Sequence, residues 1–240
     1  MAAHKVRLTR SEEVAEGTVA FYFEKPEGFQ FKAGQFSRFT LIDPPETDAE
    51  GDGRTFSIAS APHEAELMIA TRMRDTAFKR VLKTLPPGSE VEVKGPYGRM
   101  ILHDDPARPA VFLTGGIGIT PFRAIALDAT HLGLGHRLHL FYSNRRPEDA
   151  AFLDELGELE KANPNYRFVA TMTSAAGSKQ PWTGETGHIS AEMLTRFMDD
   201  LTSPVYYVAG PQGLVTAIGK TLAEAGVSEA AIRAEEFAGY

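Results

Sequence analysis

A glycine-rich turn in the middle of the chain has residue types suited to phosphate binding. The run GGIGITP (115–121) follows the apolar stretch AVFLT and precedes a segment with helical periodicity. Glycines let a backbone approach a ligand closely, and a helix N-terminus offers unpaired N–H groups and a positive dipole to a phosphate. The spacing differs from GxGxxG, and such turns also serve packing alone. At the carboxyl end of the first strand of a parallel sheet, the turn becomes the favoured ligand position.

A second group of chemically useful residues is the run RTFS (54–57) in the first half of the chain. An arginine can clamp a phosphate, an aromatic ring can cover a planar heterocycle, and a hydroxyl can bond its polar edge. On one strand Arg54 and Phe56 face one side and Thr55 and Ser57 the other, unless a bend brings them together. Taken alone, the four residues favour an ordinary half-buried strand.

The charge is unevenly distributed along the chain. The net charge of −7 argues against general binding of nucleic acids, which needs a basic surface. Residues 71–99 nevertheless carry seven basic and three acidic side chains. They form either a solvated helix face with its flanking strands or a basic region for a phosphate-bearing ligand or an acidic partner. Within this region Thr76 is predicted to cap a short helix, and GPYG (95–98) is predicted to form a tight turn.

Composition excludes several classes of site. The chain has 240 residues and no cysteine, so it holds no disulfide, thiolate metal site, cysteine nucleophile or cysteine-ligated iron–sulfur cluster. No apolar run approaches the roughly 18 residues of a membrane span, and the N-terminus lacks the apolar core of a secretory signal. We therefore expect no membrane span and a cytoplasmic protein. The three histidines of 131–139 fit a solvated loop and the start of a strand better than a metal site.

The elements that must position these residues fall into two halves. Residues 1–102 contain short alternating segments separated by turn residues, one helical stretch (76–85), and an acidic, Gly/Pro-rich segment (43–54) predicted to be a mobile hairpin loop. Residues 103–109 form a plausible linker, and residues 110–240 alternate short apolar strands with helices. This pattern predicts two domains: an antiparallel β-barrel followed by an α/β domain with a parallel sheet.

The motifs RTFSIAS, GPYG, TGGIGITP, FYSNR, YVAGP and EEF occur in this order along the chain. The ordered set resembles the ferredoxin–NADP reductase-like family of FAD/NAD(P)H oxidoreductases, and the resemblance covers essentially the whole chain. It implies a stand-alone protein without an iron–sulfur domain. Residues 1–102 would form the FAD-binding barrel, 103–109 the linker and 110–240 the NAD(P)-binding domain.

By this resemblance Arg54 binds the flavin diphosphate, Phe56 packs on the isoalloxazine ring and the hydroxyl of Ser57 lies near flavin N5. Phenylalanine replaces the commoner tyrosine, which removes a phenol hydrogen bond. The other residues that the resemblance assigns to the flavin site are Thr55, Ile69, Ala70, Thr71, Met73, Thr76, Gly95 and Gly98.

The resemblance also assigns a nicotinamide-nucleotide site, composed of Gly115, Gly116, Gly118, Ile119, Thr120, Pro121, Ser143, Arg145, Ala209, Gly210 and Pro211. Ala209 stands where many members have cysteine, so any contribution of that thiol is missing. Glu235 would lie near the nicotinamide or N5 and, with Ser57, form the catalytic pair. Either Phe237 or Tyr240 would cover the second flavin face, and the sequence does not decide between them.

The implied function is transfer of hydride from NADPH or NADH to bound FAD, and of electrons onward to a separate acceptor such as ferredoxin or flavodoxin. Arg145 and Arg146 favour NADPH slightly, whereas TMTS (171–174) lacks an arginine that NADPH-specific relatives often have. Two alternatives remain open. One is a flavin reductase that uses free flavin as a substrate, and the other is a non-catalytic, flavin-bearing electron-transfer subunit of a larger complex.

Overall fold

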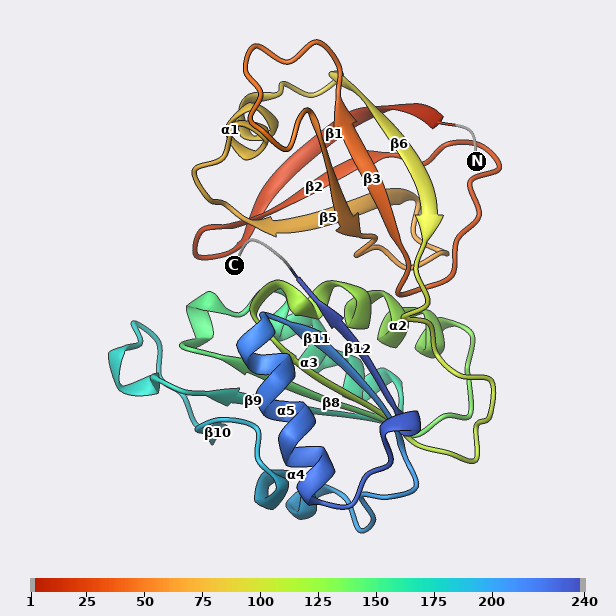
Figure 1. Ribbon diagram of the computed structural model, residues 1–240, viewed down its shortest axis with the longest axis vertical. Coiled ribbons are helices and arrows are strands. Elements are labelled where there is room, and N and C mark those ends of the chain that lie inside the picture. Colours follow the sequence, from red (N-terminus) through yellow and green to blue (C-terminus); the bar gives the residue numbers. More distant parts are fainter. Residues whose placement is uncertain (1–2, 238–240) are drawn as a thin grey trace.

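The computed structural model describes residues 3–237, which form two β-sheets arranged one above the other (Figure 1). The first sheet is entirely antiparallel and curls into a barrel, and the second is entirely parallel and carries helices on both faces. The prediction of an antiparallel barrel followed by an α/β domain is therefore confirmed.

The barrel sheet has the strand order β4-β3-β6-β1-β2-β5. Its strands are β1 (Ala3–Ala15), β2 (Thr18–Glu24), β3 (Phe36–Leu41), β4 (Gly53–Ser57), β5 (Glu66–Arg72) and β6 (Glu90–Tyr97). Alternate residues such as Phe21, Phe23 and Phe39 point inward and are buried. Helix α1 (Ala77–Thr84) adds Phe78 to the same core, and its first turn is capped as predicted because the Thr76 hydroxyl accepts a hydrogen bond from the Lys79 N–H.

The tight turn predicted for GPYG is wrong. Gly95, Pro96 and Tyr97 are the last residues of β6, and Tyr97 pairs with Phe36 of β3. Gly98, which follows the strand, has a φ of +96°, a conformation that favours glycine. At position 95 the reason for glycine is steric, because a Cβ there would lie 2.3 Å from the hydroxyl oxygen of Ser37.

The parallel sheet has the order β10-β9-β8-β7-β11-β12. Its strands are β7 (Ala110–Gly115), β8 (Leu138–Asn144), β9 (Tyr166–Met172), β10 (Glu185–Thr186), β11 (Val205–Gly210) and β12 (Ile232–Glu236). The crossovers include α2 (Thr120–His131), α3 (Leu153–Ala162), α4 (Ala191–Phe197) and α5 (Gln212–Glu224). All strands run in the same direction, but the order in which they are added changes side at β7. This strand pairs with β8 on one side and with β11 on the other. Ligands in such sheets bind at the carboxyl ends of the strands at this position.

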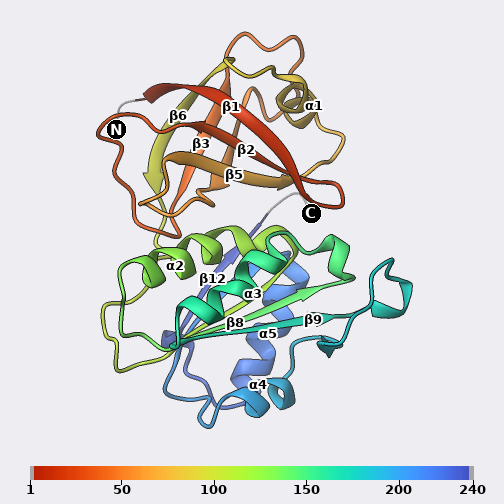
Figure 2. The ribbon, with the colours of Figure 1, turned by 180° about the vertical axis from the view of Figure 1, so that it is seen from behind.

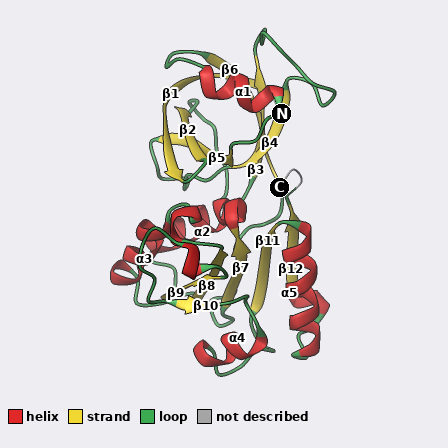
Figure 3. Cartoon of the chain, turned by 90° about the vertical axis from the view of Figure 1, so that its left-hand side faces the viewer, coloured by secondary structure: helices red, strands yellow, loops and turns green. Residues whose placement is uncertain are grey.

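Two apolar cores lie on opposite faces of the parallel sheet. Phe112 packs with α2 and α3 on one face, whereas Val111 and Leu113 pack with α4 and α5 on the other. Figure 3 shows these helices on the two sides of the sheet, and Figure 2 shows α2 directly beneath the barrel. Of the helices in residues 3–237, none combines the length and the apolar character needed to cross a membrane.

One buried arginine joins the barrel to the helical layer. Arg123 of α2 is only 6% exposed, and its guanidinium donates to the Ala59 carbonyl at 2.8 Å and to Glu64 at 2.9 Å. It also donates to Glu155 of α3 at 2.7 and 2.6 Å. Burial alone would raise the pKa of Glu64, but the hydrogen bonds and charge of Arg123 outweigh burial and lower that pKa. This network fixes the position of the barrel on α2.

Replacing Arg123 by methionine is expected to lower the free energy of unfolding by about 2–4 kcal/mol, because two carboxylates then face each other without their shared cation. Urea denaturation followed by circular dichroism measures this loss. The matched control is Arg167→Met, since Arg167 is paired with Glu160 at an exposed site and should cost less than about 1 kcal/mol. If the two substitutions lowered the free energy of unfolding equally, the proposed role of Arg123 in holding the barrel on α2 would be contradicted.

Candidate active site and nucleotide cavity

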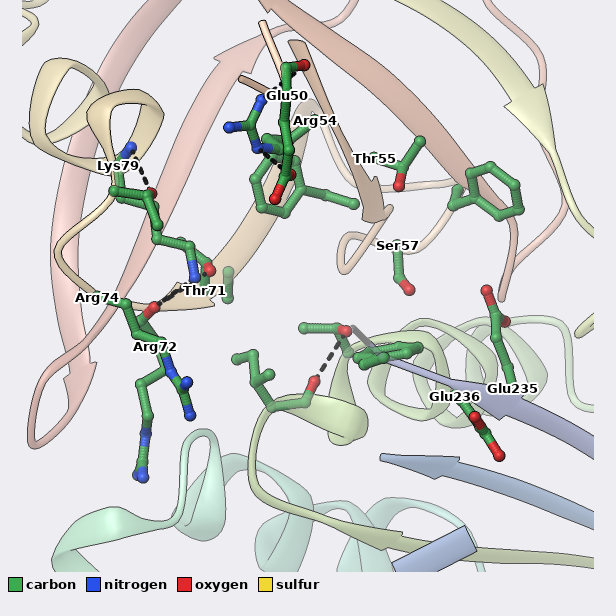
Figure 4. Close-up of a pocket in the computed structure, with 17 residues that line it drawn as sticks. Glu50, Arg54, Thr55, Ser57, Thr71, Arg72, Arg74, Lys79, Glu235 and Glu236 are labelled. Carbon is green, nitrogen blue, oxygen red and sulfur yellow. Dashed lines mark hydrogen bonds and ion pairs between the residues drawn. The ribbon is translucent and has the colours of Figure 1, made fainter. Parts of the chain in front are cut away.

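A cavity of about 350 Å³ lies where the barrel meets the loops of the parallel sheet, and we call it the barrel cavity. Its walls come from β4, from the end of β5, from α1, from the loop after β7 and from β12 (Figure 4). The predicted site residues that line it are Arg54, Thr55, Phe56, Ser57, Ala70, Thr71, Thr76, Thr120, Glu235 and Phe237. All four residues of the RTFS run therefore contribute to one cavity, although a regular strand would divide them between two faces.

The barrel cavity is basic at one end and holds a carboxyl and a hydroxyl group at the other. Arg72, Arg74 and Lys79 lie at the basic end, and Ser57 and Glu235 lie at the opposite end (Figure 4). Ser57 is 8% exposed. Burial raises the pKa of Glu235 above its usual value, so its neutral form persists to a higher pH than that of an exposed glutamate. Such a cavity suits a ligand with an anionic end and a polar planar end.

Arg54 is engaged by its own neighbours in the chain. The segment 42–52, which we call the acidic loop, supplies Asp48 at 2.5 Å from Nη2 and Glu50 at 3.0 Å from Nε. The remaining nitrogen, Nη1, donates to the carbonyls of Gly51 at 2.9 Å and Gly53 at 3.0 Å. The hydrogen bond from Arg54 lowers the pKa of Asp48. The predicted hairpin loop is thus held to the barrel by ion pairs, and all three nitrogens of the Arg54 guanidinium contact it or the start of β4.

A second cavity, of about 490 Å³, lies at the carboxyl ends of β7, β8 and β11, and we call it the sheet cavity. The predicted residues that line it are Gly115, Gly116, Ser143, Arg145 and Pro211. Arg72 lines both cavities, so the basic end of the barrel cavity adjoins the sheet cavity. This position is the one expected for a ligand at the reversal point of a parallel sheet.

Arg145 and Arg146 differ in what surrounds their side chains. Arg146 donates to both carboxylate oxygens of Asp149, at 3.0 and 2.9 Å, and is therefore held in the protein. Arg145 is exposed and lines the sheet cavity.

Asn144, which the sequence reasoning missed, is 7% exposed, and its side-chain nitrogen has no hydrogen-bond partner within residues 3–237. Its place at the carboxyl end of β8 was the signal that could have identified it.

The remaining predicted residues line neither cavity. They are Ile69, Met73, Gly95, Gly98, Gly118, Ile119, Pro121, Ala209 and Gly210. Gly118 allows close packing, because a Cβ there would lie 2.4 Å from the carbonyl oxygen of Ala209. The same oxygen accepts a hydrogen bond from the Thr114 hydroxyl at 2.7 Å, which fixes the glycine-rich turn against β11. Tyr240 lies outside the described residues, whereas Phe237 lines the barrel cavity.

Residues 112–220 match the protein family described as the oxidoreductase NAD-binding domain. The chain is 28% identical over 239 residues to the glycine betaine monooxygenase reductase subunit of Chromohalobacter salexigens, covering 98% of this chain and 64% of that protein. It is 29% identical over 176 residues to ferredoxin–NADP reductase B of Sorangium cellulosum, covering 71% and 69%. It spans less than two thirds of the first curated relatives, at 64% and 58% of their lengths.

Solved structures support the fold independently. A ferredoxin NADP⁺ reductase from Neisseria gonorrhoeae, crystallised with bound FAD and NADP, has a TM-score of 0.81 at 22% identity, and the match covers 98% of both chains. The barrel and the parallel sheet agree with this architecture over nearly the full length of both chains. The chain therefore shares the two-domain fold of this reductase, and its second half matches the NAD-binding domain of oxidoreductases.

Proposed function

We propose that the protein is an NAD(P)H-dependent oxidoreductase that holds FAD in the barrel cavity, receives NADPH or NADH in the sheet cavity, and passes electrons to a separate acceptor. The polarity of the barrel cavity carries this proposal. Arg72, Arg74 and Lys79 at one end suit a diphosphate, and Ser57 and Glu235 at the other suit the polar edge of a flavin ring. In this assignment residues 1–102 bind FAD, 103–109 are the linker and 110–240 bind the nucleotide.

The side chains proposed for the reaction have few chemical tasks, since the cofactors carry the reactivity. When bound, FAD supplies an acceptor for hydride and a donor of electrons to the next protein. Ser57 and Glu235 would hydrogen-bond the polar edge of the ring, and Phe56 and Phe237 would cover it. The chain contributes positioning and exclusion of water, which together account for large rate effects.

The proposed acceptor is an electron-carrier protein such as ferredoxin or flavodoxin. Several relatives are named as reductase subunits or components of oxygenases, and another as a ferredoxin–NADP reductase. The 240-residue chain has no cysteine, so it holds no cysteine-ligated iron–sulfur cluster to relay electrons. Within these 240 residues the electrons would therefore have no cysteine-ligated cluster to pass through after the flavin.

Spectroscopy of the purified protein tests the proposal. Stoichiometric FAD that is bleached anaerobically by NADPH or NADH, and reoxidised by an added ferredoxin or flavodoxin, supports it. A colourless protein that reduces added flavin would indicate a flavin reductase instead. Bound flavin that reacts with neither nucleotide would indicate an electron-transfer subunit, and the ratio of kcat/KM values for the two nucleotides identifies the preferred donor.

Replacing Phe237 by alanine is expected to change nucleotide affinity more than FAD content. Phe237 lines the barrel cavity with Glu235, and its N–H donates at 2.9 Å to the carbonyl of Gly210, the residue before Pro211 of the sheet cavity. If the nicotinamide must displace the Phe237 ring from the flavin, that displacement weakens nucleotide binding. Removal of the ring should therefore lower the nucleotide Kd up to about tenfold. Phe237→Tyr keeps the ring and serves as the control. Loss of FAD in parallel with the change in nucleotide Kd would contradict this role.

A further inference from the structure

Glu148 is a glutamate whose side chain is only 9% exposed. It lies in the short 3₁₀ helix Pro147–Asp149, which follows β8. Arg145 and Asp149, on either side of it in the chain, line the sheet cavity, so Glu148 belongs to the segment that forms one wall of that cavity. A carboxylate removed from water needs hydrogen-bond donors from the protein, and the identity of these donors shows what the side chain holds in place.

Both carboxylate oxygens of Glu148 accept hydrogen bonds from the same loop. The backbone N–H of Lys179 donates to Oε1 at 3.0 Å, and the hydroxyl of Ser178 donates to Oε2 at 2.7 Å. The guanidinium of Arg146 lies 3.4 Å from Oε1. The hydrogen bond from the Lys179 N–H is the largest cause that lowers the pKa of Glu148 to about 2, and Ser178 and Arg146 lower it further. The carboxylate is therefore ionised at neutral pH, and its hydrogen bonds to the loop are charge-assisted.

The loop that Glu148 holds comprises residues 173–184, and we call it the edge loop. It connects β9 to β10, and Figure 1 shows it reaching past the edge of the parallel sheet. Its first residue, Thr173, lines the sheet cavity, and the chain returns to the same cavity at His188 and Ile189. The chain on both sides of the edge loop thus reaches the sheet cavity, and Glu148 holds the middle of the loop.

The barrel contacts the same place through the turn between β1 and β2. The N–H of Glu16 donates to the carbonyl oxygen of Glu148 at 2.8 Å. The Glu16 carboxylate lies 3.3 Å from Nζ of Lys179 and 3.4 Å from Nη2 of Arg146. Glu16 therefore contacts both the wall of the sheet cavity and the edge loop. This is a second attachment of the barrel, made by residues that do not belong to the Arg123 network.

We propose that Glu148 and Glu16 are positioning residues for the nicotinamide nucleotide, which act by holding the edge loop in the conformation that completes the sheet cavity. This inference rests on the proposed function, because it takes the sheet cavity as the nucleotide site. The nucleotide site is then not built by residues 110–240 alone, since the barrel holds one wall of it in place through Glu16.

A loop that leaves its place for part of the time weakens nucleotide binding, because the observed Kd is the intrinsic Kd divided by the fraction of molecules in the binding conformation. Glu148→Gln keeps one acceptor oxygen but turns an NH₂ group toward one of the two donors, so one hydrogen bond is lost. We expect this change to raise the Kd of NADP⁺ or NAD⁺ by about three- to tenfold. FAD content should stay the same, because the described residues that line the barrel cavity include neither Glu148 nor any part of the edge loop.

Glu16→Gln should have a smaller effect that depends on salt. The ion pairs of Glu16 with Lys179 and Arg146 are partly exposed, so they are weak and are screened by ions. The backbone hydrogen bond from Glu16 to Glu148 survives the substitution. The nucleotide Kd should rise about twofold at low salt. This difference from the unmodified chain should disappear at about 1 M NaCl.

Trp182 allows the edge loop to be observed directly, because it is the single tryptophan of the chain and lies in this loop. Acrylamide quenching of its fluorescence measures release of the loop before any nucleotide is added. Titration of the FAD-loaded protein with NADP⁺ and with NAD⁺ gives the two Kd values. Glu148→Gln should increase the quenching constant and raise the Kd values. Glu224→Gln, at an exposed glutamate that pairs with Lys220 on α5, is the matched control and should change neither.

A double-mutant cycle with Ser178→Ala tests whether Glu148 acts through the edge loop. If the two side chains act through the hydrogen bond between them, the double variant should raise the nucleotide Kd by less than the product of the two single fold-changes. Fold-changes that multiply would show that Glu148 acts by another route, and would overturn the inference.

Two further results would overturn the inference while leaving the proposed function in place. In the first, Glu148→Gln has unchanged nucleotide Kd values or unchanged quenching of Trp182. In the second, it loses FAD in parallel with the nucleotide, which would show a general structural role for the glutamate. An unmodified chain that holds FAD but binds neither NADP⁺ nor NAD⁺ would instead overturn the proposed function, and this inference with it.

Discussion

Replacing Glu235 by alanine is expected to lower the rate constant for reduction of bound flavin by NADPH or NADH roughly 100-fold, the loss typical of one preorganised hydrogen-bonding group in a buried site. Glu235 lines the barrel cavity at the end opposite the cations, and Ser57 lies at the same end (Figure 4). Anaerobic stopped-flow spectroscopy at the flavin absorption band measures this rate constant. Glu224→Ala, on the exposed face of α5, is the control.

The pH dependence of the same rate constant tests the protonation state of Glu235. Because burial raises its pKa, the carboxyl is neutral and able to donate a hydrogen bond up to a higher pH than usual. The rate constant should therefore fall as the pH rises through that raised pKa. Glu235→Gln donates at every pH, so it should keep most of the rate constant and lose this fall. A Gln variant as slow as the Ala variant would show that the ionised carboxylate is the active form.

The second large effect is expected at Gly118. Its Cβ would lie 2.4 Å from the carbonyl oxygen of Ala209, which belongs to the backbone of β11, and 2.7 Å from the hydroxyl oxygen of Thr114, which is hydrogen-bonded to that carbonyl. Gly118→Ala should lower the free energy of unfolding by roughly 2–3 kcal/mol. The distorted turn should also bind the nucleotide more weakly. Urea denaturation and nucleotide titration measure the two effects.

Gly219 provides the matched control for this substitution. It lies in the middle of α5, and nothing is within 4 Å of the position of its Cβ. Gly219→Ala should raise the free energy of unfolding by about 0.5–1 kcal/mol, because alanine favours the helix. If Gly118→Ala raised the free energy of unfolding as much as Gly219→Ala, the close approach of the turn to β11 would not be the reason for glycine at position 118.

Most of the fold was predictable because its signals are local. Short apolar runs ended by polar or glycine turns marked β7, β8, β9 and β11, and the helical periods between them marked the crossovers. Strand β12 was missed because IRAEE contains three charged residues and pairs only with β11 at the edge of the sheet, where one strand side faces outward. An edge strand needs no continuous apolar run, so periodicity gave no signal for it.

The site was predictable in its motifs but not in its electrostatics. The RTFS run was identified from residue types, yet local alternation placed Thr55 and Ser57 away from Arg54 and Phe56. The cavity contacts all four because β4 lies at the edge of the barrel sheet. The basic region was visible in the sequence, whereas the burial of Lys79 depends on how α1 packs on the barrel. No local pattern records that packing.

The acidic loop also shortens the range over which the positive charge of residues 71–99 can attract an approaching molecule. Its five carboxylates slightly outweigh the net positive charge of residues 71–99, and they hold Arg54 and Arg80 directly. The two segments together carry a net charge of −1, so the field of the basic residues is largely cancelled at distances beyond a Debye length, about 8 Å at physiological ionic strength. Long-range electrostatic steering by this region would add little to the association rate of an acidic carrier protein. Encounter would rest instead on shape and short-range contact, and its rate would depend only weakly on salt.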